Sequence, residues 1–246
     1  MNGLGILAAL AAESRELGAA RRGPDRTATL ADGTLLVLSG MGPEAAREGA
    51  RLLIQAGATA LLSWGMAGGL DPALAAGTVV LPGEVVSPDG SSFRTEPRWQ
   101  AGVAAAVAAR LPVSTGRLLT SAEPLGSSAA KADAFRRSAA VAVDMESAGV
   151  AAVASDARLP FLAVRVIVDT ATDAVPPSAL AAATAGSGAL RLGRVLASLA
   201  RTPRDIGPLI RLGSRYRIAL GALRVVARSG ALAPRLSTAA TGTALT

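Results

Sequence analysis

The sequence contains no cysteine and no histidine, and each absence excludes a class of chemistry. Without cysteine there are no disulfides, zinc ribbons or cysteine nucleophiles. Without histidine there are no serine–histidine triads, imidazole metal sites or histidine general bases. Acid–base chemistry must therefore be carried by carboxylates, and a transition-state anion must be met by arginine or backbone N–H groups. We expect neither a metal nor an organic cofactor.

Aromatic residues make up only 2% of the 246 residues, and lysine occurs once, at Lys131. Because half of the residues are hydrophobic, the core must be built from alanine, valine, leucine and isoleucine. A chain of this length forms one large α/β domain or two small ones.

Charge is distributed unevenly along the chain. Residues 1–200 hold 17 basic and 17 acidic residues, whereas residues 201–246 hold eight arginines against Asp205 and carry the whole net charge of +7. We therefore divide the chain into a catalytic domain, 1–200, and a basic C-terminal helix with a disordered tail, 201–246.

No apolar run approaches the roughly 18 residues of a membrane span. The apolar start, Met1 to Leu10, lacks the basic segment of a signal peptide, so a cytoplasmic protein is expected. In residues 204–228, arginines alternate with apolar positions, which predicts either an amphipathic helix at the inner face of the membrane or a helix packed on the domain. Nucleic-acid binding is disfavoured, because the segment has a single tyrosine on which bases could stack.

Short apolar runs predict strands, and longer segments with helical spacing predict helices. The strands are expected at Leu4–Leu10, Thr34–Ser39, Ala60–Trp64, Thr78–Leu81, Arg117–Ser121, Ala139–Val143 and Phe161–Asp169. The helices are expected at Pro43–Gln55, Ala101–Arg110, Glu146–Ala157 and Ser178–Leu199. This alternation predicts an α/β fold with a largely parallel sheet and helices on both faces. The polar stretch Ser87–Arg98 is expected to be an active-site loop or an interface.

Two carboxylates, Asp144 and Glu146, lie where a predicted strand ends and a helix begins. Ligands of open α/β sheets bind at the carboxyl ends of strands, and a carboxylate there can accept hydrogen bonds from both hydroxyls of a ribose. The structural alternative is that Asp144 caps the helix and Glu146 favours its positive first turn.

Glycine-rich loops, Gly40–Pro43 and Gly65–Gly69, follow two other predicted strands. Glycines let the backbone approach a ligand and expose N–H groups to it, although tight strand-to-helix turns use glycine as well. Together with the acids, these loops indicate a binding site.

Six collinear segments between Gly5 and about Pro177 resemble the nucleoside phosphorylase superfamily, nearest to its methylthioadenosine/S-adenosylhomocysteine nucleosidase branch. They are Gly5–Leu10 leading to Glu13, Ser39–Gly42, Trp64–Leu70, Gly77–Val80, Val143–Ser147 and Val164–Asp169. A finer resemblance, to the hopanoid-associated phosphorylase subgroup, rests on Gly42–Glu44, Ala67–Pro72, Val143–Ser147 and Asp169–Pro177. The resemblance implies a single-domain three-layer fold with a mixed, mostly parallel sheet flanked by helices.

The resemblance also implies an activity: cleavage of the N-glycosidic bond of an adenine nucleoside with a bulky apolar 5′ group, such as adenosylhopane in hopanoid biosynthesis. Adenine would be released by hydrolysis or by phosphorolysis, and a homo-oligomer is implied. A methylthioadenosine/S-adenosylhomocysteine-type nucleosidase is the alternative. A non-catalytic nucleoside-binding module, or a membrane- or RNA-binding module, is the alternative of another class.

Three residues match the catalytic positions of the family. Asp169 matches the general acid that protonates the leaving purine at N7, and Glu13 matches the acid that activates water. Arg165 matches an arginine that orients nearby acids. The alternative is a purely structural role, in an ion pair at the end of the sheet. Glu13 taken alone would be an ordinary solvated helix residue.

The other matched positions bind substrate. Glu146 matches the residue that binds the ribose hydroxyls, and Met145 matches the side chain that packs on the sugar. Leu10 and Met41 match positions that line the 5′ pocket, and both are apolar. The remaining positions assigned to substrate binding are Met66, Gly68 and Leu125.

Several positions depart from the family pattern. Met66 stands where nucleosidases often have serine, and Val168 replaces a serine that supports the acid. Pro124 and Leu125 stand where an aromatic and an aliphatic residue hold adenine, so stacking on the base is weakened.

Phosphorylases of the superfamily clamp phosphate with Gly-Asp-Pro-x-Arg in the first loop, where this chain has Leu10–Glu13. A carboxylate there would repel the anion, although Arg15 and Arg47 are near in sequence and could compensate. The local chemistry favours water as the nucleophile, with phosphate as the alternative co-substrate.

Overall fold

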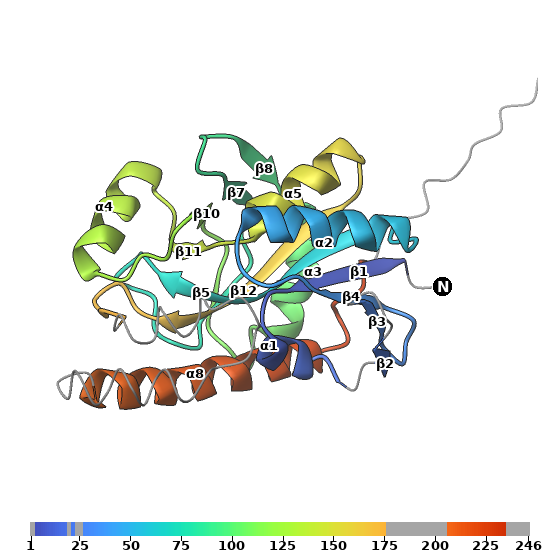
Figure 1. Ribbon diagram of the computed structural model, residues 1–246. Helices are drawn as coiled ribbons and strands as arrows, with labels where there is room; N and C mark the ends of the chain where they lie inside the picture. The colour runs from blue at the N-terminus through green and yellow to red at the C-terminus, as the bar shows by residue number, and fades with distance from the viewer. Residues whose placement is uncertain (1–2, 19–20, 23–26, 176–205, 235–246) are drawn as a thin grey trace, which may run out of the picture.

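Figure 1 shows the computed structural model of the chain, which describes residues 3–18, 21–22, 27–175 and 206–234. A twelve-stranded mixed sheet lies between two layers of helices. Helices α2 (Pro43–Gln55) and α5 (Ser147–Asp156) cover one face, and α8 (Ile206–Ala227) runs along the other with α1 (Ala11–Arg15) and α3 (Pro97–Val107). The predicted α/β architecture is confirmed.

The centre of the sheet is a parallel pair of long strands, β5 (Ala60–Gly69) and β12 (Phe161–Asp169). Both strands are buried almost throughout, as expected where helices cover both faces of a sheet. From β5 the sheet continues one way through β1 (Leu4–Ala8), β4 (Leu35–Leu38), β3 (Thr27–Thr29) and β2 (Arg21–Arg22). It continues the other way through β11 (Ala142–Asp144), β10 (Leu118–Thr120), β7 (Glu84–Val86) and β8 (Ser92–Arg94). The short strands β6 (Val79–Val80) and β9 (Val113–Ser114) extend it beside β12.

Two elements have the predicted bounds, α2 and β12. Strand β5 is five residues longer than predicted, because the glycine-rich segment Gly65–Gly69 continues as a strand and is not a loop. It pairs with β12 through Gly68 and, in antiparallel fashion, with β11 through Gly68 and Gly69. Main-chain hydrogen bonding to two neighbours therefore overrides the weak strand preference of glycine.

Other predictions require correction. The strand predicted from Ala139 begins at Ala142, because Ala139 ends helix α4 (Ser128–Ser138) in a left-handed conformation with φ of 53°. Residues 87–98 form part of a hairpin with β8 and the start of α3, and none of them lines the cavity described below. Helix α3 starts earlier than predicted, at Pro97, where Glu96 caps it. The predicted helix Ser178–Leu199 lies outside the described residues.

The C-terminal helix α8 packs on the domain through its second half. Ala219, Ala222, Leu223 and Val226 are buried in the core cluster that contains β12 and α3. Arg224 also pairs with Glu16 at 2.7 Å. The packing predicted as one of the two alternatives is therefore present in the second half of α8. None of the helices in the described residues combines the length and the apolarity needed to cross a bilayer.

Candidate active site

The carboxyl ends of the central strands surround a cavity of about 200 Å³. Most of its lining is apolar, and five carboxylates reach it. The lining residues are Ala9, Leu10, Glu13, Met41, Met66, Ala67, Gly68, Glu123, Pro124, Leu125, Val143, Asp144, Met145, Glu146, Val168, Asp169 and Val175. A concave apolar site with a few polar groups at strand ends is typical of a small-molecule site.

The structure brings nearly all the predicted site residues together in this cavity. Those that line it are Glu13, Asp169, Glu146, Met145, Met41, Leu10, Met66, Gly68 and Leu125. Arg165 does not line it and is 1% exposed, behind the carboxylates. The sequence reasoning missed Glu123 and Val175, which come from loops without a recognisable pattern.

Glu146 is held at the cavity by a loop that is distant in sequence. Its Oε1 accepts the N–H of Gly42 at 3.2 Å. The Gly42 loop is close because α2 and α5 meet at Gly149, where an added Cβ would lie 2.4 Å from the carbonyl oxygen of Pro43. Burial raises the pKa of Glu146 to about 7 against the opposing charge of Arg165, and Asp144 and Glu13 add to the shift. A carboxylate with this surrounding can accept hydrogen bonds from a diol.

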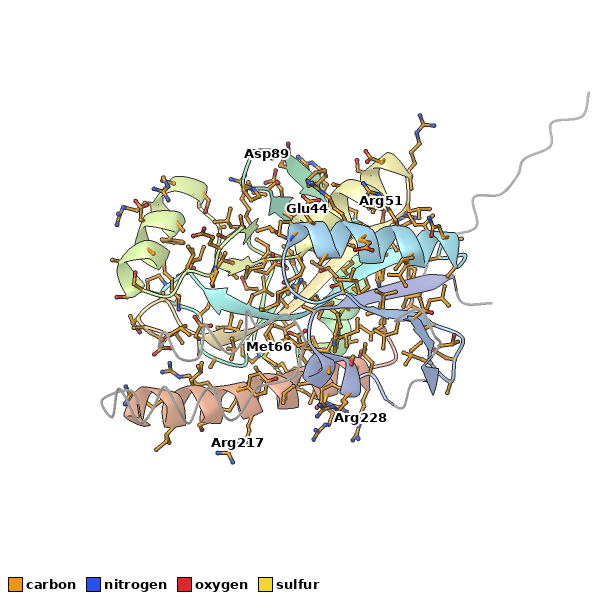
Figure 2. The ribbon with its side chains drawn as sticks, viewed as in Figure 1. Glu44, Arg51, Met66, Asp89, Arg217 and Arg228 are labelled. Carbon is orange, nitrogen blue, oxygen red and sulfur yellow. The ribbon has the colours of Figure 1, made fainter. Side chains whose placement is uncertain are left out.

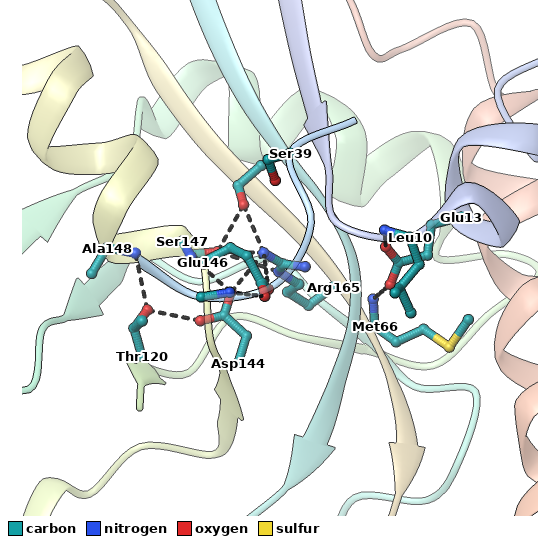
Figure 3. Close-up of polar contacts among 12 residues, drawn as sticks. Leu10, Glu13, Ser39, Met66, Thr120, Asp144, Glu146, Ser147, Ala148 and Arg165 are labelled. Carbon is teal, nitrogen blue, oxygen red and sulfur yellow. Dashed lines mark hydrogen bonds and ion pairs between the residues drawn. The ribbon is translucent and has the colours of Figure 1, made fainter. Parts of the chain in front are cut away.

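Arg165 is the buried cation that holds the acids in place (Figure 3). Its Nη2 lies 2.7 Å from Asp144 Oδ2 and 3.5 Å from Glu146 Oε2. The same atom donates to the hydroxyls of Ser63 at 2.7 Å and Ser147 at 3.2 Å. Burial alone would lower the pKa of Arg165. The negative charges of Asp144, Glu146 and Glu13 have the larger effect and raise that pKa. The guanidinium therefore stays charged and orients carboxylates from two directions.

Asp144 has the structural role that the helix-capping interpretation predicts. Its Oδ2 accepts the N–H of Ser147, the first residue of α5, at 3.1 Å. Its Oδ1 accepts the hydroxyl of Thr120 at 2.7 Å, and that hydroxyl accepts the N–H of Ala148 (Figure 3). Glu146 makes no such capping bond, so the two acids of this segment act differently.

Glu13 is 3% exposed and not solvated, although it lies on the short surface helix α1. Its two carboxylate oxygens accept the N–H groups of Met66 and Leu10, both at 2.9 Å (Figure 3). Burial raises the pKa of Glu13, against the charge of Arg165 and these N–H groups. Gly65 makes room for it, since a Cβ there would lie 2.7 Å from Glu13 Oε1 and 2.5 Å from Arg165 Nη1.

Asp169 ends β12 on the opposite side of the cavity, where it pairs with the buried ammonium of Lys131. The partner was not predicted, because helix α4 was not predicted. The one signal in the sequence was that Lys131 is the single lysine of an arginine-rich chain. Leu125, Pro124 and Val168 also line the cavity, and none of them is aromatic.

Among the residues that the structure describes, no arginine or lysine lines the cavity. Arg15 is exposed, and Arg47 pairs with Glu44 at 2.8 Å. The two arginines considered as compensating phosphate ligands therefore lie outside the cavity lining.

A family model described as the phosphorylase superfamily matches residues 4–201. The chain belongs to the phosphorylase superfamily. It is accordingly an enzyme of N-glycosyl bond cleavage, a purine nucleosidase or nucleoside phosphorylase. No curated protein matches it in sequence.

Solved structures of this superfamily share the fold at low identity. A methylthioadenosine/S-adenosylhomocysteine nucleosidase from Neisseria meningitidis, in complex with methylthio-immucillin-A, is 20% identical with a TM-score of 0.69, covering 93% of this chain and 98% of its own. The corresponding enzyme from Colwellia psychrerythraea, in complex with adenine, is 18% identical with a TM-score of 0.67, covering 93% and 95%. Futalosine hydrolase of Helicobacter pylori is 16% identical with a TM-score of 0.66, covering 92% and 97%.

Proposed function

We propose that this enzyme is a nucleosidase, which hydrolyses the N-glycosidic bond of an adenine nucleoside with an apolar 5′ group. The observation that carries the proposal is the meeting of Glu13, Glu146 and Asp169 in one cavity. The three carboxylates come from different strand ends. Each therefore has a separate part of a nucleoside within reach: the attacking water, the ribose hydroxyls and the base.

Breaking the bond leaves an electron-poor ribose and an electron-rich purine. Asp169 donates a proton to purine N7 as the C1′–N9 bond breaks and its electron pair moves to the base. Glu146 accepts hydrogen bonds from the ribose hydroxyls and favours the positive charge that develops on the sugar. Glu13 takes a proton from the water that attacks C1′, and its raised pKa suits a base that works near neutrality.

Water is supported as the nucleophile by the charges around Glu13. A phosphate ion there would face Glu13 and Glu146, and the described part of the lining offers no cation to bind it. Arg165 is already paired with Asp144 and Glu146, and Lys131 with Asp169. Phosphate as a co-substrate would require a cation beyond those of the described lining residues.

The 5′ substituent is proposed to be bulky and apolar, as in adenosylhopane. Leu10 and Met41 line the cavity beside Glu13, and Val175 adds a third apolar side chain. The cavity itself is too small for a triterpenoid, so such a group would extend out through its mouth. The same small volume favours the second candidate, a methylthioadenosine/S-adenosylhomocysteine-type nucleosidase with a compact 5′ group.

Peripheral contact with an anionic membrane belongs to the same proposal, since a lipid-linked nucleoside has to be collected from a bilayer. Helix α8 exposes Ile210 by 69% and Ile218 by 51%. Arg217 projects from this helix into solvent, and Arg228 does so directly after its end (Figure 2). Exposed isoleucines beside arginines suit an anionic lipid surface.

The 5′ preference is tested with a series of adenosines whose 5′-thioether chain grows from methyl to long alkyl. Adenine release is measured by chromatography, and kcat/KM is compared along the series. A rise with chain length supports the lipid-like substrate. A maximum at methyl or homocysteinyl supports the second candidate, and inosine analogues serve as the control for base preference.

A further inference from the structure

Lys131, the single lysine of the chain, is buried beside the acid of the proposed reaction. It lies on α4 and is 1% exposed. Its Nζ donates to Asp169 Oδ2, to the carbonyl of Thr170 at 2.8 Å and to that of Asp173 at 3.1 Å. An ammonium group has three N–H donors, and each has an acceptor here. The cation is therefore held in one position.

The groups around this ammonium are fixed from both sides. The carboxylate of Asp173 accepts the N–H of Thr170 at 2.7 Å and its hydroxyl at 2.6 Å, which closes the turn that presents the two carbonyls. Arg215 of α8 pairs with the same carboxylate. On the other side, Ser127 caps α4, and Ala134 anchors the helix in a small apolar cluster. Lys131 is therefore part of a built network and not a surface side chain folded inward.

This network leaves one oxygen of Asp169 to the cavity. Oδ2 is occupied by Lys131, and no hydrogen bond within the described residues uses Oδ1. Gly68 lies against the carboxylate, since an added Cβ would be 3.2 Å from Oδ2 and 3.6 Å from Oδ1. The residue before the acid, Val168, carries no hydrogen-bond donor in its side chain. Lys131 is thus the side chain that fixes the orientation of Asp169.

We propose that Lys131 is the positioning residue for Asp169, and this inference rests on the proposed function. Lys131 holds Oδ2 so that Oδ1 faces purine N7. Asp169 first takes up a proton from solvent on Oδ1; as that proton passes to N7 and the C1′–N9 bond breaks, Asp169 returns to the carboxylate that is paired with Lys131. The ammonium then neutralises that carboxylate, an interaction that is stronger after proton transfer than before it and so lowers the barrier.

The test compares two leaving groups. Lys131→Met is expected to lower kcat for a 5′-alkylthioadenosine by about 100-fold with KM nearly unchanged, because a positioned general acid contributes about 10²–10⁴-fold. With the matched 4-nitrophenyl riboside the same variant should stay within about threefold of wild type, because nitrophenolate leaves without a proton. Arg136→Met is the control, since it removes a cation from an exposed site on the same helix. Equal losses with both substrates would overturn the role of Lys131.

A double-mutant cycle gives a second test, which also covers a single variant that fails to fold. If Lys131 acts through Asp169, then Lys131→Met added to Asp169→Asn should lower kcat no further. The double variant leaves no unpaired buried charge, so its folding is protected. If the kcat losses of the two single variants multiply in the double variant, the proposal is overturned. Absence of adenine release by the wild-type enzyme would instead overturn the proposed function and this role with it.

Discussion

Gly42 donates its backbone N–H to Glu146 across 104 positions of sequence, at 3.2 Å. Gly42 itself has φ of 100°, a left-handed conformation that favours glycine. The bond joins the first glycine-rich loop to the acid proposed to bind ribose. Two features that were separate in the sequence are thus parts of one wall of the cavity.

Glu146→Gln is expected to weaken substrate binding and turnover together, because a neutral amide is a poorer acceptor for two hydroxyls than a carboxylate. A 2′-deoxy substrate should lose less from the substitution than the ribo substrate, since one of the two bonds is already missing. Measuring kcat/KM for both substrates in both enzymes checks this. Equal losses would assign Glu146 a structural role only.

Asp169→Asn should leave the fold intact and lower adenine release by about two to four orders of magnitude, as for loss of a general acid. Circular dichroism and thermal unfolding establish that the variant is folded before its turnover is measured. Turnover close to that of wild type would remove Asp169 from the mechanism.

The free energy of unfolding should fall as pH rises from about 5 to above 7. The pKa of Glu146 is raised to about 7 in the folded state, so the native protein binds a proton that the unfolded chain has released. The stabilisation from this bound proton is fully present below the pKa that Glu146 has in the unfolded chain. It is lost as pH rises through the pKa that Glu146 has in the folded protein, and it amounts to at most about 3 kcal/mol. Denaturant titrations at several pH values measure it, and Glu146→Gln should flatten the slope. An equally steep slope in that variant would contradict the assignment.

Gly65→Ala should destabilise the protein by about 1–3 kcal/mol and abolish most activity, because the new methyl group would collide with Arg165 and Glu13. Gly102→Ala is the matched control, on the exposed face of α3 with nothing within 4 Å of the added Cβ. There the change should stabilise the helix by about 0.5–1 kcal/mol. Thermal unfolding and adenine release are measured for both. An active, stable Gly65→Ala enzyme would refute the close packing at Glu13.

Arg217→Gln should weaken binding to anionic vesicles about fivefold, the loss expected for about 1 kcal/mol per arginine near such a surface. Arg51→Gln removes the same charge from α2, on the opposite side of the molecule (Figure 2), and should have no effect. Vesicle co-sedimentation measures both variants. If Arg51→Gln weakens binding as much as Arg217→Gln, attraction depends on overall charge and not on α8.

How far the sequence predicts this protein depends on the kind of signal. Helix α2 and strand β12 have uninterrupted patterns, and their bounds were predicted. Glu13 could be placed only by resemblance, because nothing local shows that a glutamate on a short helix will be buried. Lys131 could not be placed, since α4 has weak apolar periodicity and the contact with Asp169 spans 38 positions.

The packing of α8 could have been read more closely from the sequence. Its buried residues Ala219, Ala222, Leu223 and Val226 follow the spacing of one helical face. Two of these four residues are alanines, whose small side chains give only a weak signal of a buried face, whereas the arginines clearly mark the solvent face.

We expect Glu13 to direct water, and not phosphate, to C1′ of an adenine nucleoside. To test this, a 5′-alkylthioadenosine is incubated with the enzyme in ¹⁸O-labelled water that contains phosphate. The mass of the sugar product is then measured by mass spectrometry. The expected products are free adenine and a free 5′-substituted ribose that carries one ¹⁸O atom at C1′, formed at a rate independent of phosphate. A ribose 1-phosphate without ¹⁸O at C1′, formed at a rate that depends on phosphate, would contradict it.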